Sequence, residues 1–153
     1  MSKKKLAKVL GIVSSILVMV AMISFTVSMF TITKTLTASL FAEGAEEPFQ
    51  LNITEDPTTG VLNGVARLKV SGRGFMSTNV SATLKILDAK GNILFSGSNY
   101  TIVSPGEIKY LTMKFSLSRV DFRMLRGKIT LGFRTFFNLV GIEFSSEISG
   151  EGG

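Results

Sequence analysis

The stretch TITKTLTASLF, residues 31–41, carries two periodicities at once. Hydroxyl side chains recur at every second position, as on one face of a β-strand, and they are Thr31, Thr33, Thr35, Thr37 and Ser39. Apolar side chains recur at every fourth position, as on one stripe of a helix, and they are Ile32, Leu36 and Leu40. The architecture depends on whether this stretch begins a β domain or ends a preceding helix.

The segment before it is apolar enough to cross a membrane. Between Lys8 and Lys34 the chain has 25 residues without a charge, VLGIVSSILVMVAMISFTVSMFTIT. A transmembrane helix needs about 20 apolar residues. A cleaved signal peptide, the alternative, would have an apolar core of about 7–15 residues followed by a small-x-small site. Glu43, two residues before Ala45, spoils that site, so the sequence favours a retained transmembrane helix.

Charge is unevenly distributed along the chain of 153 residues. The net charge of +6 comprises +4 from Lys3, Lys4, Lys5 and Lys8, +1 from Lys34, and +1 from the rest, where 12 Lys and Arg face 11 Asp and Glu. A nucleic-acid groove would need the basic excess on the folded body, so nucleic acid is not an expected partner. Because Cys and His are both absent, zinc sites and His-based triads are excluded.

Four basic residues precede the apolar segment and one follows it, which predicts a cytoplasmic N-terminus and an extracytoplasmic body in the cell membrane. Three Asn-x-Ser/Thr sequons agree with that orientation and are candidate N-glycosylation sites. They begin at Asn52, Asn79 and Asn99.

After Gly44 the apolar period changes to two, and turn signals such as DPTTG, SGRG, DAKGN and SPGE separate the alternating runs. In EIKYLTMKFSLS, for example, Met113 and Phe115 alternate with Thr112 and Lys114. VGIEFSSEIS places Phe144 on the inward side in the same way. Repeated short strands of this kind predict an all-β, antiparallel sandwich.

Since the sandwich has enough strands without residues 31–41, we favour a helix there, with the strand as the alternative. Extended upstream, the apolar stripe resembles a helix-packing seam that could contact other helices. Its members are Phe25, Met29, Ile32, Leu36 and Leu40. A helix over residues 6–42 would be about 55 Å long and exceed a bilayer core of about 30 Å, so it would serve as both anchor and stalk.

The order of turns also carries a family resemblance. A strand ends in the Gly-rich bend SGRGF, a second strand reaches the hairpin DAKG, and the Pro-Gly turn SPGE leads into an alternating strand. Over residues 49–149 this resembles the late-embryogenesis-abundant type 2 family, or water-stress and hypersensitive-response (WHy) domain, most of all its membrane-anchored archaeal and bacterial members. The family usually has Asn-Pro in the bend. The resemblance implies a small β-sandwich of the fibronectin or immunoglobulin type behind one transmembrane helix, without enzymatic activity.

Residues that could carry chemistry have structural explanations. Glu55 and Asp56 are adjacent carboxylates in a turn, too few oxygens for a calcium site. Asp88 is typical of a hairpin turn, and Gly72 to Gly74 lack the ending of a phosphate loop. A basic cluster could meet an anionic surface, although a solvated rim is the simpler explanation, and its members are Arg119, Arg123, Arg126, Lys128 and Arg134. One aromatic of the pair Phe136 and Phe137 should point outward.

The predicted organisation is a cytoplasmic basic tail (1–8), a transmembrane helix continuing into an extracytoplasmic stalk (9–42), a linker (43–48), the sandwich (49–149) and a flexible tail (150–153). We expect no catalysis, cofactor or metal. Membrane lipid and protein partners, or other copies of the chain meeting through the helix, are the expected partners. The function expected is a structural or binding role at the cell surface, within a membrane complex. The alternative is a pilin-like subunit of an extracellular filament assembled through the long helix.

Overall fold

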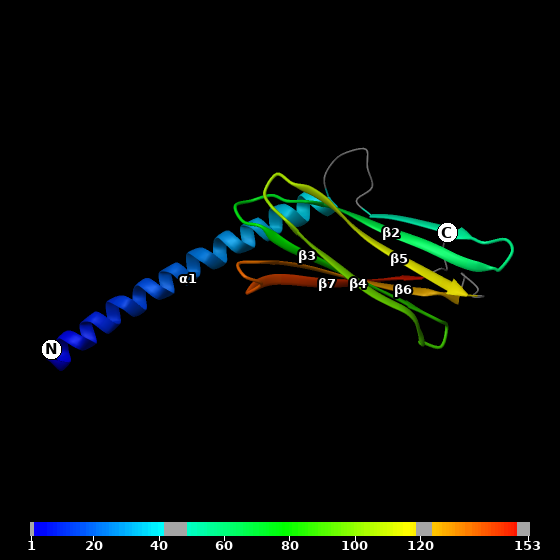
Figure 1. Cartoon of the computed structure of the whole chain (residues 1–153). Coiled ribbons are helices and arrows are strands. Elements are labelled where there is room, and N and C mark those ends of the chain that lie inside the picture. The colour runs from blue at the N-terminus through cyan, green and yellow to red at the C-terminus, as the bar shows by residue number, and fades with distance from the viewer. Residues whose placement is uncertain (1, 42–48, 119–123, 150–153) are drawn as a thin grey trace.

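The structure, a computed structural model, describes residues 2–41, 49–118 and 124–149. It begins with one long helix, α1 (Lys3–Leu40), which projects from a β domain (Figure 1). The side chain of Ser2 caps the first turn by accepting a hydrogen bond from the Lys5 amide at 3.4 Å. Phe41 ends the helix, and its amide donates to the Thr37 carbonyl. The prediction that residues 31–41 continue a helix is therefore confirmed, with an end at Leu40.

Seven antiparallel strands follow and form two sheets. The first sheet has the order β1-β2-β5, with β1 (Phe49–Glu55), β2 (Val61–Ser71) and β5 (Ile108–Ser118). The second has the order β4-β3-β6-β7, with β3 (Thr78–Leu87), β4 (Ile93–Val103), β6 (Arg126–Thr135) and β7 (Val140–Ser149). The two sheets pack face to face, which confirms the predicted sandwich behind one N-terminal helix.

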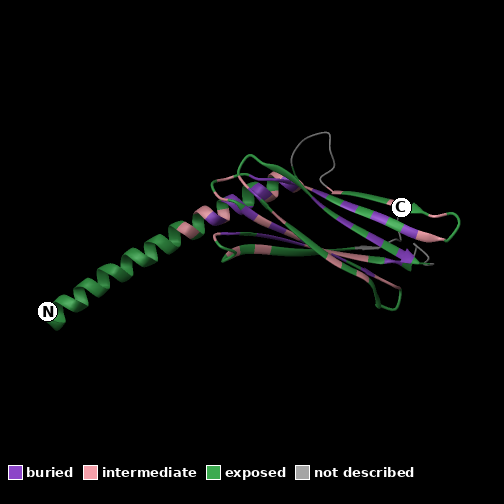
Figure 2. Ribbon diagram, viewed as in Figure 1, coloured by how far each residue is buried: buried purple, intermediate pink, exposed green. Residues whose placement is uncertain are grey.

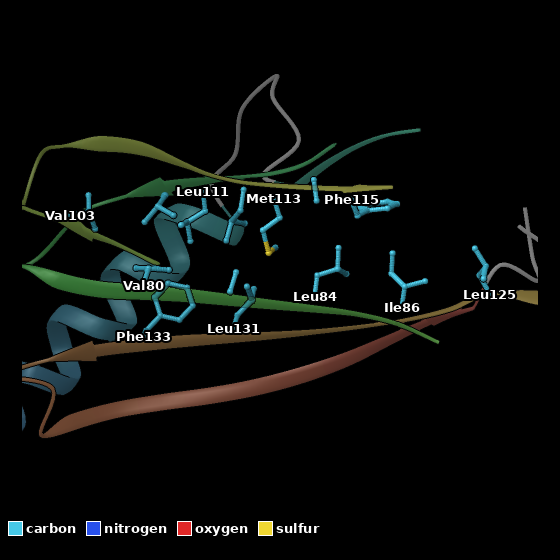
Figure 3. Packing of buried hydrophobic residues seen from close by; sticks show 14 of the residues in the cluster. Val80, Leu84, Ile86, Val103, Leu111, Met113, Phe115, Leu125, Leu131 and Phe133 are labelled. Atoms are coloured by element: carbon cyan, nitrogen blue, oxygen red, sulfur yellow. The ribbon is translucent and has the colours of Figure 1, made fainter. Parts of the chain in front are cut away.

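The core lies between the sheets and follows the predicted alternation (Figure 3). Phe115 is buried, and its ring lies over Gly64 on the paired strand β2 and 5.8 Å, centroid to centroid, from the ring of Phe95 in the other sheet. A Cβ atom at Gly64 would overlap the Phe115 ring, so this glycine makes room for the aromatic side chain. Phe133 is fully buried on β6.

Phe144 departs from its prediction. We expected it to be buried, but 38% of it is exposed. Its ring does face inward far enough to stack on Phe133, with centroids 6.2 Å apart. β7 is the edge strand of its sheet, however, so no further strand among the described residues covers the outer side of the ring. Alternation gives the face of a strand, and the strand's place in the sheet decides how much that face is covered.

Burial divides α1 into two parts (Figure 2). No residue of the free part, residues 3–27, is buried. The packed part, residues 28–40, lies against the sandwich and contributes Ser28, Thr31, Ile32, Thr35 and Ser39 to its interior. Thr33 and Thr37 are exposed, so the hydroxyl column splits into alternate members that face opposite sides of the helix.

Two predicted segments, the linker 43–48 and the tail 150–153, lie outside the described residues. The predicted domain boundaries therefore stay predictions at those two places. Arg119 and Arg123 of the basic cluster lie outside the described residues as well.

Candidate functional site: the junction of helix and sandwich

The packed part of α1 covers an edge that β1 leaves open. Pairing of β1 with β2 stops where Phe49 meets Leu68, so within the described residues the end of β2 and the following bend have no strand beyond them on that side. The Gly72 amide donates to the Glu107 carbonyl, toward β5. The amides of Ser71, Arg73 and Phe75 point the other way, toward α1.

Three hydroxyl oxygens of α1 accept hydrogen bonds from these three amides. The Ser71 amide donates to Ser39 Oγ at 3.0 Å, the Arg73 amide to Thr35 Oγ1 at 3.1 Å, and the Phe75 amide to Thr31 Oγ1 at 3.2 Å. Thr35 Oγ1 also donates to the Arg73 carbonyl at 3.1 Å. We call this set of contacts the hydroxyl ladder. It satisfies an edge that would otherwise present unpaired backbone groups.

The hydroxyl ladder can form because the spacing of the hydroxyls along the helix matches the spacing of the amides along the strand edge. Ser39, Thr35 and Thr31 are four residues apart, which is about 6.0 Å along a helix at 1.5 Å per residue. The amides that donate to them are two residues apart, and the first two, at Ser71 and Arg73, should lie about 6.6 Å apart in an extended chain. The helix and the edge run antiparallel, since Ser39 meets Ser71 and Thr31 meets Phe75. The two periodicities of residues 31–41 are thereby both accounted for by one helix.

The SGRG bend allows this close approach. Gly74 has φ +87°, and a Cβ atom there would lie 2.7 Å from the Cα of Thr31 on α1. A Cβ atom at Gly72 would collide with the backbone of Ser104 on the other side. The two glycines therefore let one bend lie against the helix and against the β4–β5 connection at once, which is a packing role.

The apolar seam that we predicted for contacts with other helices is used largely within the chain. Ile32 is fully buried in the core of the sandwich, and Met29, Leu36 and Leu40 are partly buried against that core. Phe25 alone of the five lies in the free part and is exposed. The expected seam is corrected accordingly, because the sandwich folds back onto the last third of the helix and covers it.

A shallow groove of about 410 Å³ runs beside the ladder, between α1 and the bend, and two cations, Lys34 and Arg73, line it. The Lys34 ammonium lies 5.5 Å from the centroid of the Phe30 ring, which itself stacks on Phe75 with centroids 5.5 Å apart. Neither cation forms an ion pair with any carboxylate in the described parts of the chain. The groove therefore joins an apolar rim to two positive charges.

The β6–β7 loop reaches the same end of the molecule. Thr135, the last residue of β6, donates from its hydroxyl to the Ser77 carbonyl at 3.0 Å. In the loop, Phe136, Phe137 and Asn138 have φ between 52° and 63°, a backbone conformation that residues other than glycine rarely adopt. The predicted outward aromatic is Phe137, which is 91% exposed, and Leu139 beside it is 76% exposed.

The three sequons differ in accessibility. Asn52 is exposed on the edge strand β1. Asn79 is half-buried on β3, where its amide nitrogen donates to Asn138 Oδ1 and its own oxygen is buried. Asn99 is exposed on β4, but its side chain bonds the Thr112 carbonyl and the Tyr100 amide. Asn52 is therefore the most accessible of the three.

The carboxylates singled out in the sequence bond their own turns. Asp56 Oδ1 accepts the Thr58 amide at 2.8 Å, and this bond, first among several, lowers the pKa of Asp56. Asp88 accepts from both the side chain and the backbone of Asn92, which lowers its pKa and confirms its role in the hairpin. Among the described residues no three His, Cys, Asp or Glu side chains gather as metal ligands do.

The basic cluster does not converge on one surface within the described residues. Arg126 and Lys128 lie at the start of β6, whereas Arg134 lies near its end and faces Glu143 at 4.0 Å. Eight residues of strand separate Arg126 from Arg134, about 26 Å at 3.3 Å per residue. Sequence reasoning missed Lys34, Arg73 and Phe75, which the fold brings together at the groove. It also missed the exposed Leu139 of the β6–β7 loop. No signal in the local sequence marks any of the four.

Comparisons with known proteins support the β-sandwich fold and show no function. No protein family and no curated protein matches the chain. Among solved structures, Bacteroides uniformis β-glucuronidase 2 resembles it with a TM-score of 0.53 and 9% identity over 72% of this chain and 14% of that enzyme. A protein described as ApaA from Bordetella pertussis matches at a TM-score of 0.43 and 15% identity, over 68% of this chain and 94% of its own. The chain thus spans a small fraction of the glucuronidase, and the likeness is one of β-sandwich fold.

Proposed function

We propose that this chain is a single-pass membrane protein whose β-sandwich, held outside the cytoplasm, has a non-catalytic structural or binding role at the cell surface. One observation carries the proposal. The apolar free part of α1 is continuous with a packed part that belongs to the sandwich interior. The anchor and the domain are thus joined by a hydrogen-bonded junction and by buried Ile32.

The same junction argues for a retained anchor over a cleaved signal peptide. Cleavage within residues 28–40 would remove Ile32 from the core or hydroxyls from the ladder. From Val9 to Val27 the free part has no charged residue, and its large apolar side chains are exposed on all sides, which is typical of a helix surrounded by lipid. The four lysines ahead of the span support a cytoplasmic N-terminus.

The proposed topology can be tested on intact cells that express the chain with a tag at each end. Added protease should remove the C-terminal tag and leave the N-terminal tag protected. A protected C-terminal tag would contradict the orientation, and release of the sandwich without α1 into the medium would contradict the anchor.

Membership of the late-embryogenesis-abundant type 2 family remains part of the proposal. Of the three features that carry the resemblance, those at Asp88 to Asn92 and at Ser104 to Glu107 are hydrogen-bonded turns, and the third, at Gly72 to Gly74, is a bend. Such turns support the shape of the domain, and no residue with a catalytic role follows from them.

The filament subunit is the second candidate, favoured by the projecting free part of α1, which could bundle with other copies (Figure 1). Electron microscopy of the native membrane fraction separates the two candidates. Filaments that carry this chain would support a pilin-like subunit, and isolated or complexed particles within the membrane would support the anchored domain.

A further inference from the structure

We propose that the end of the sandwich from which α1 leaves rests on the membrane, with a collar of apolar side chains inserted into the lipid interface. The collar consists of Phe30, Phe75, Phe137 and Leu139. The inference rests on the proposed membrane anchor and names the surface of the sandwich that lipid contacts. All four side chains are between 45% and 91% exposed, although they are among the largest apolar residues of the domain.

The collar residues come from three segments that meet at one level of the helix. Phe30 belongs to α1, Phe75 to the β2–β3 connection, and Phe137 and Leu139 to the β6–β7 loop. Both connections lie at the end of the sandwich from which α1 projects (Figure 1). They are linked through Met76, whose sulfur lies 3.9 Å from Ser28 Oγ and 3.7 Å from Thr135 Oγ1. The loop that carries Phe137 thus begins beside Ser28.

Ser28 is also where the lipid should end. Counting 20 residues, about 30 Å of helix, from Val9 after the last lysine of the tail brings the span to Ser28. Independently, Ser28 is the first residue of α1 that the sandwich buries. The edge of the hydrocarbon and the edge of the domain therefore coincide, and the collar lies at that edge.

The charges beside the collar suit a phospholipid surface. Lys34 lies six residues beyond Ser28, about 9 Å farther along the helix, and its ammonium turns back over the Phe30 ring. Long basic side chains near a helix end reach back to the interface in this way. Arg73 lies across the groove from Lys34, so both cations stand just above the collar, at the height of lipid phosphates. The carboxylate of Glu107, in the neighbouring β4–β5 connection, does not offset these two positive charges through an ion pair. It accepts a hydrogen bond from the Ser104 amide and lies 3.7 Å from the Lys109 ammonium.

The β6–β7 loop holds its apolar side chains outward at a conformational cost. Three successive residues other than glycine occupy the left-handed region. The loop is fixed by the bond from the Leu139 amide to the Phe136 carbonyl and by the Asn79–Asn138 contact at 3.3 Å. In water this arrangement exposes Phe137 and Leu139, and no burial of apolar surface offsets its conformational cost. A lipid interface would bury both side chains. A second copy of the chain is the competing occupant, which the experiment below distinguishes.

The absence of cysteine makes the test direct, because single cysteines can be introduced and labelled with an environment-sensitive fluorophore. The full-length variants are Phe137→Cys and Leu139→Cys in the collar, Val18→Cys in the middle of the span, and Ile93→Cys as the matched control. Ile93 is 57% exposed and lies at the opposite end of the sandwich, after the β3–β4 hairpin. Each is reconstituted in phosphatidylcholine vesicles that contain nitroxide lipids labelled near the headgroup or deep in the acyl chain.

We expect severalfold quenching of the labels at 137 and 139 by the shallow nitroxide, quenching at 18 by the deep one, and no quenching at 93. Quenching at 18 with labels at 137 and 139 that behave like 93 would overturn the collar while leaving the anchor intact. No quenching at 18 by either lipid would refute the anchor itself. Shielding at 137 that rises with protein density, without quenching by lipid, would assign the collar to a second copy and overturn the inference.

Discussion

The two parts of α1 carry the same kinds of side chain and use them differently. In the free part, the hydroxyls of Ser15 and Thr26 donate to carbonyls four residues earlier in the helix, both at 2.9 Å. In the packed part, Thr31, Thr35 and Ser39 accept from amides of the sandwich. A hydroxyl without water or a partner must bond its own helix, which is the common solution in lipid. Where an open strand edge lies beside the helix, the same residue type forms hydrogen bonds that join the helix to the sandwich.

Removing the buried apolar contact of the packed part should have the largest effect. Ile32→Ala deletes a fully buried side chain from the core, which typically costs about 2–5 kcal/mol of unfolding free energy. Ile23→Ala, in the free part, removes a side chain that is 56% exposed and should leave the sandwich unchanged. Thermal unfolding of both variants in detergent measures the difference. Equal melting temperatures would mean that α1 contributes nothing to the domain.

Crowding the contact between bend and helix should have the next effect. Gly74→Ala and Gly91→Ala both place a side chain at a φ of about +86° to +87°, which costs roughly 1–2 kcal/mol by itself. Only Gly74→Ala also places its Cβ 2.7 Å from α1, since nothing lies within 4 Å at Gly91. We expect Gly74→Ala to be the more destabilising of the two in chemical denaturation. An equal loss at both sites would show that the helix does not approach the bend this closely.

Breaking one rung of the ladder should have a smaller effect. Thr35→Val keeps the shape of the side chain and removes the partner of the Arg73 amide and carbonyl, a loss of about 1–3 kcal/mol for buried groups left unpaired. Thr37→Val, two residues farther along and on the exposed side of the helix, should change stability by less than about 0.5 kcal/mol. A double-mutant comparison with Ser39→Ala would show whether the rungs act together.

Acid should act on the sandwich alone, and weakly. Asn92 lowers the pKa of Asp88 through its side-chain hydrogen bond, and the Thr58 and Ser104 amides do the same for Asp56 and Glu107. A depressed pKa gives stability that is present above the ordinary carboxyl pKa and lost as pH falls through the lowered value. We therefore expect the melting temperature to fall below about pH 4, near the ordinary carboxyl value. Asp88→Asn should flatten part of that fall, while α1, which has no carboxylate, should keep its helicity.

The strand faces could be predicted because alternation records which side of a strand meets the core, as at Met113 and Phe115. The exposure of Phe144 could not, since it depends on β7 being an edge strand. The apolar seam of α1 was visible in the sequence, but its partner was not. Periodicity shows that a face is packed and cannot say whether the same chain or another one covers it. The collar depends on the helix and two connections meeting in space, which local sequence does not encode.

The last third of α1 completes the sandwich, and amide hydrogen exchange tests this residue by residue. In the full chain, the amides of Ser71, Arg73 and Phe75 should exchange slowly, because helix hydroxyls accept them. In a variant with Thr31→Val, Thr35→Val and Ser39→Ala, these three amides should exchange fast. The Gly72 amide, bonded to Glu107 on the other side, should stay slow in both. Fast exchange at 71, 73 and 75 in the unmodified chain, or unchanged protection in the variant, would contradict the claim.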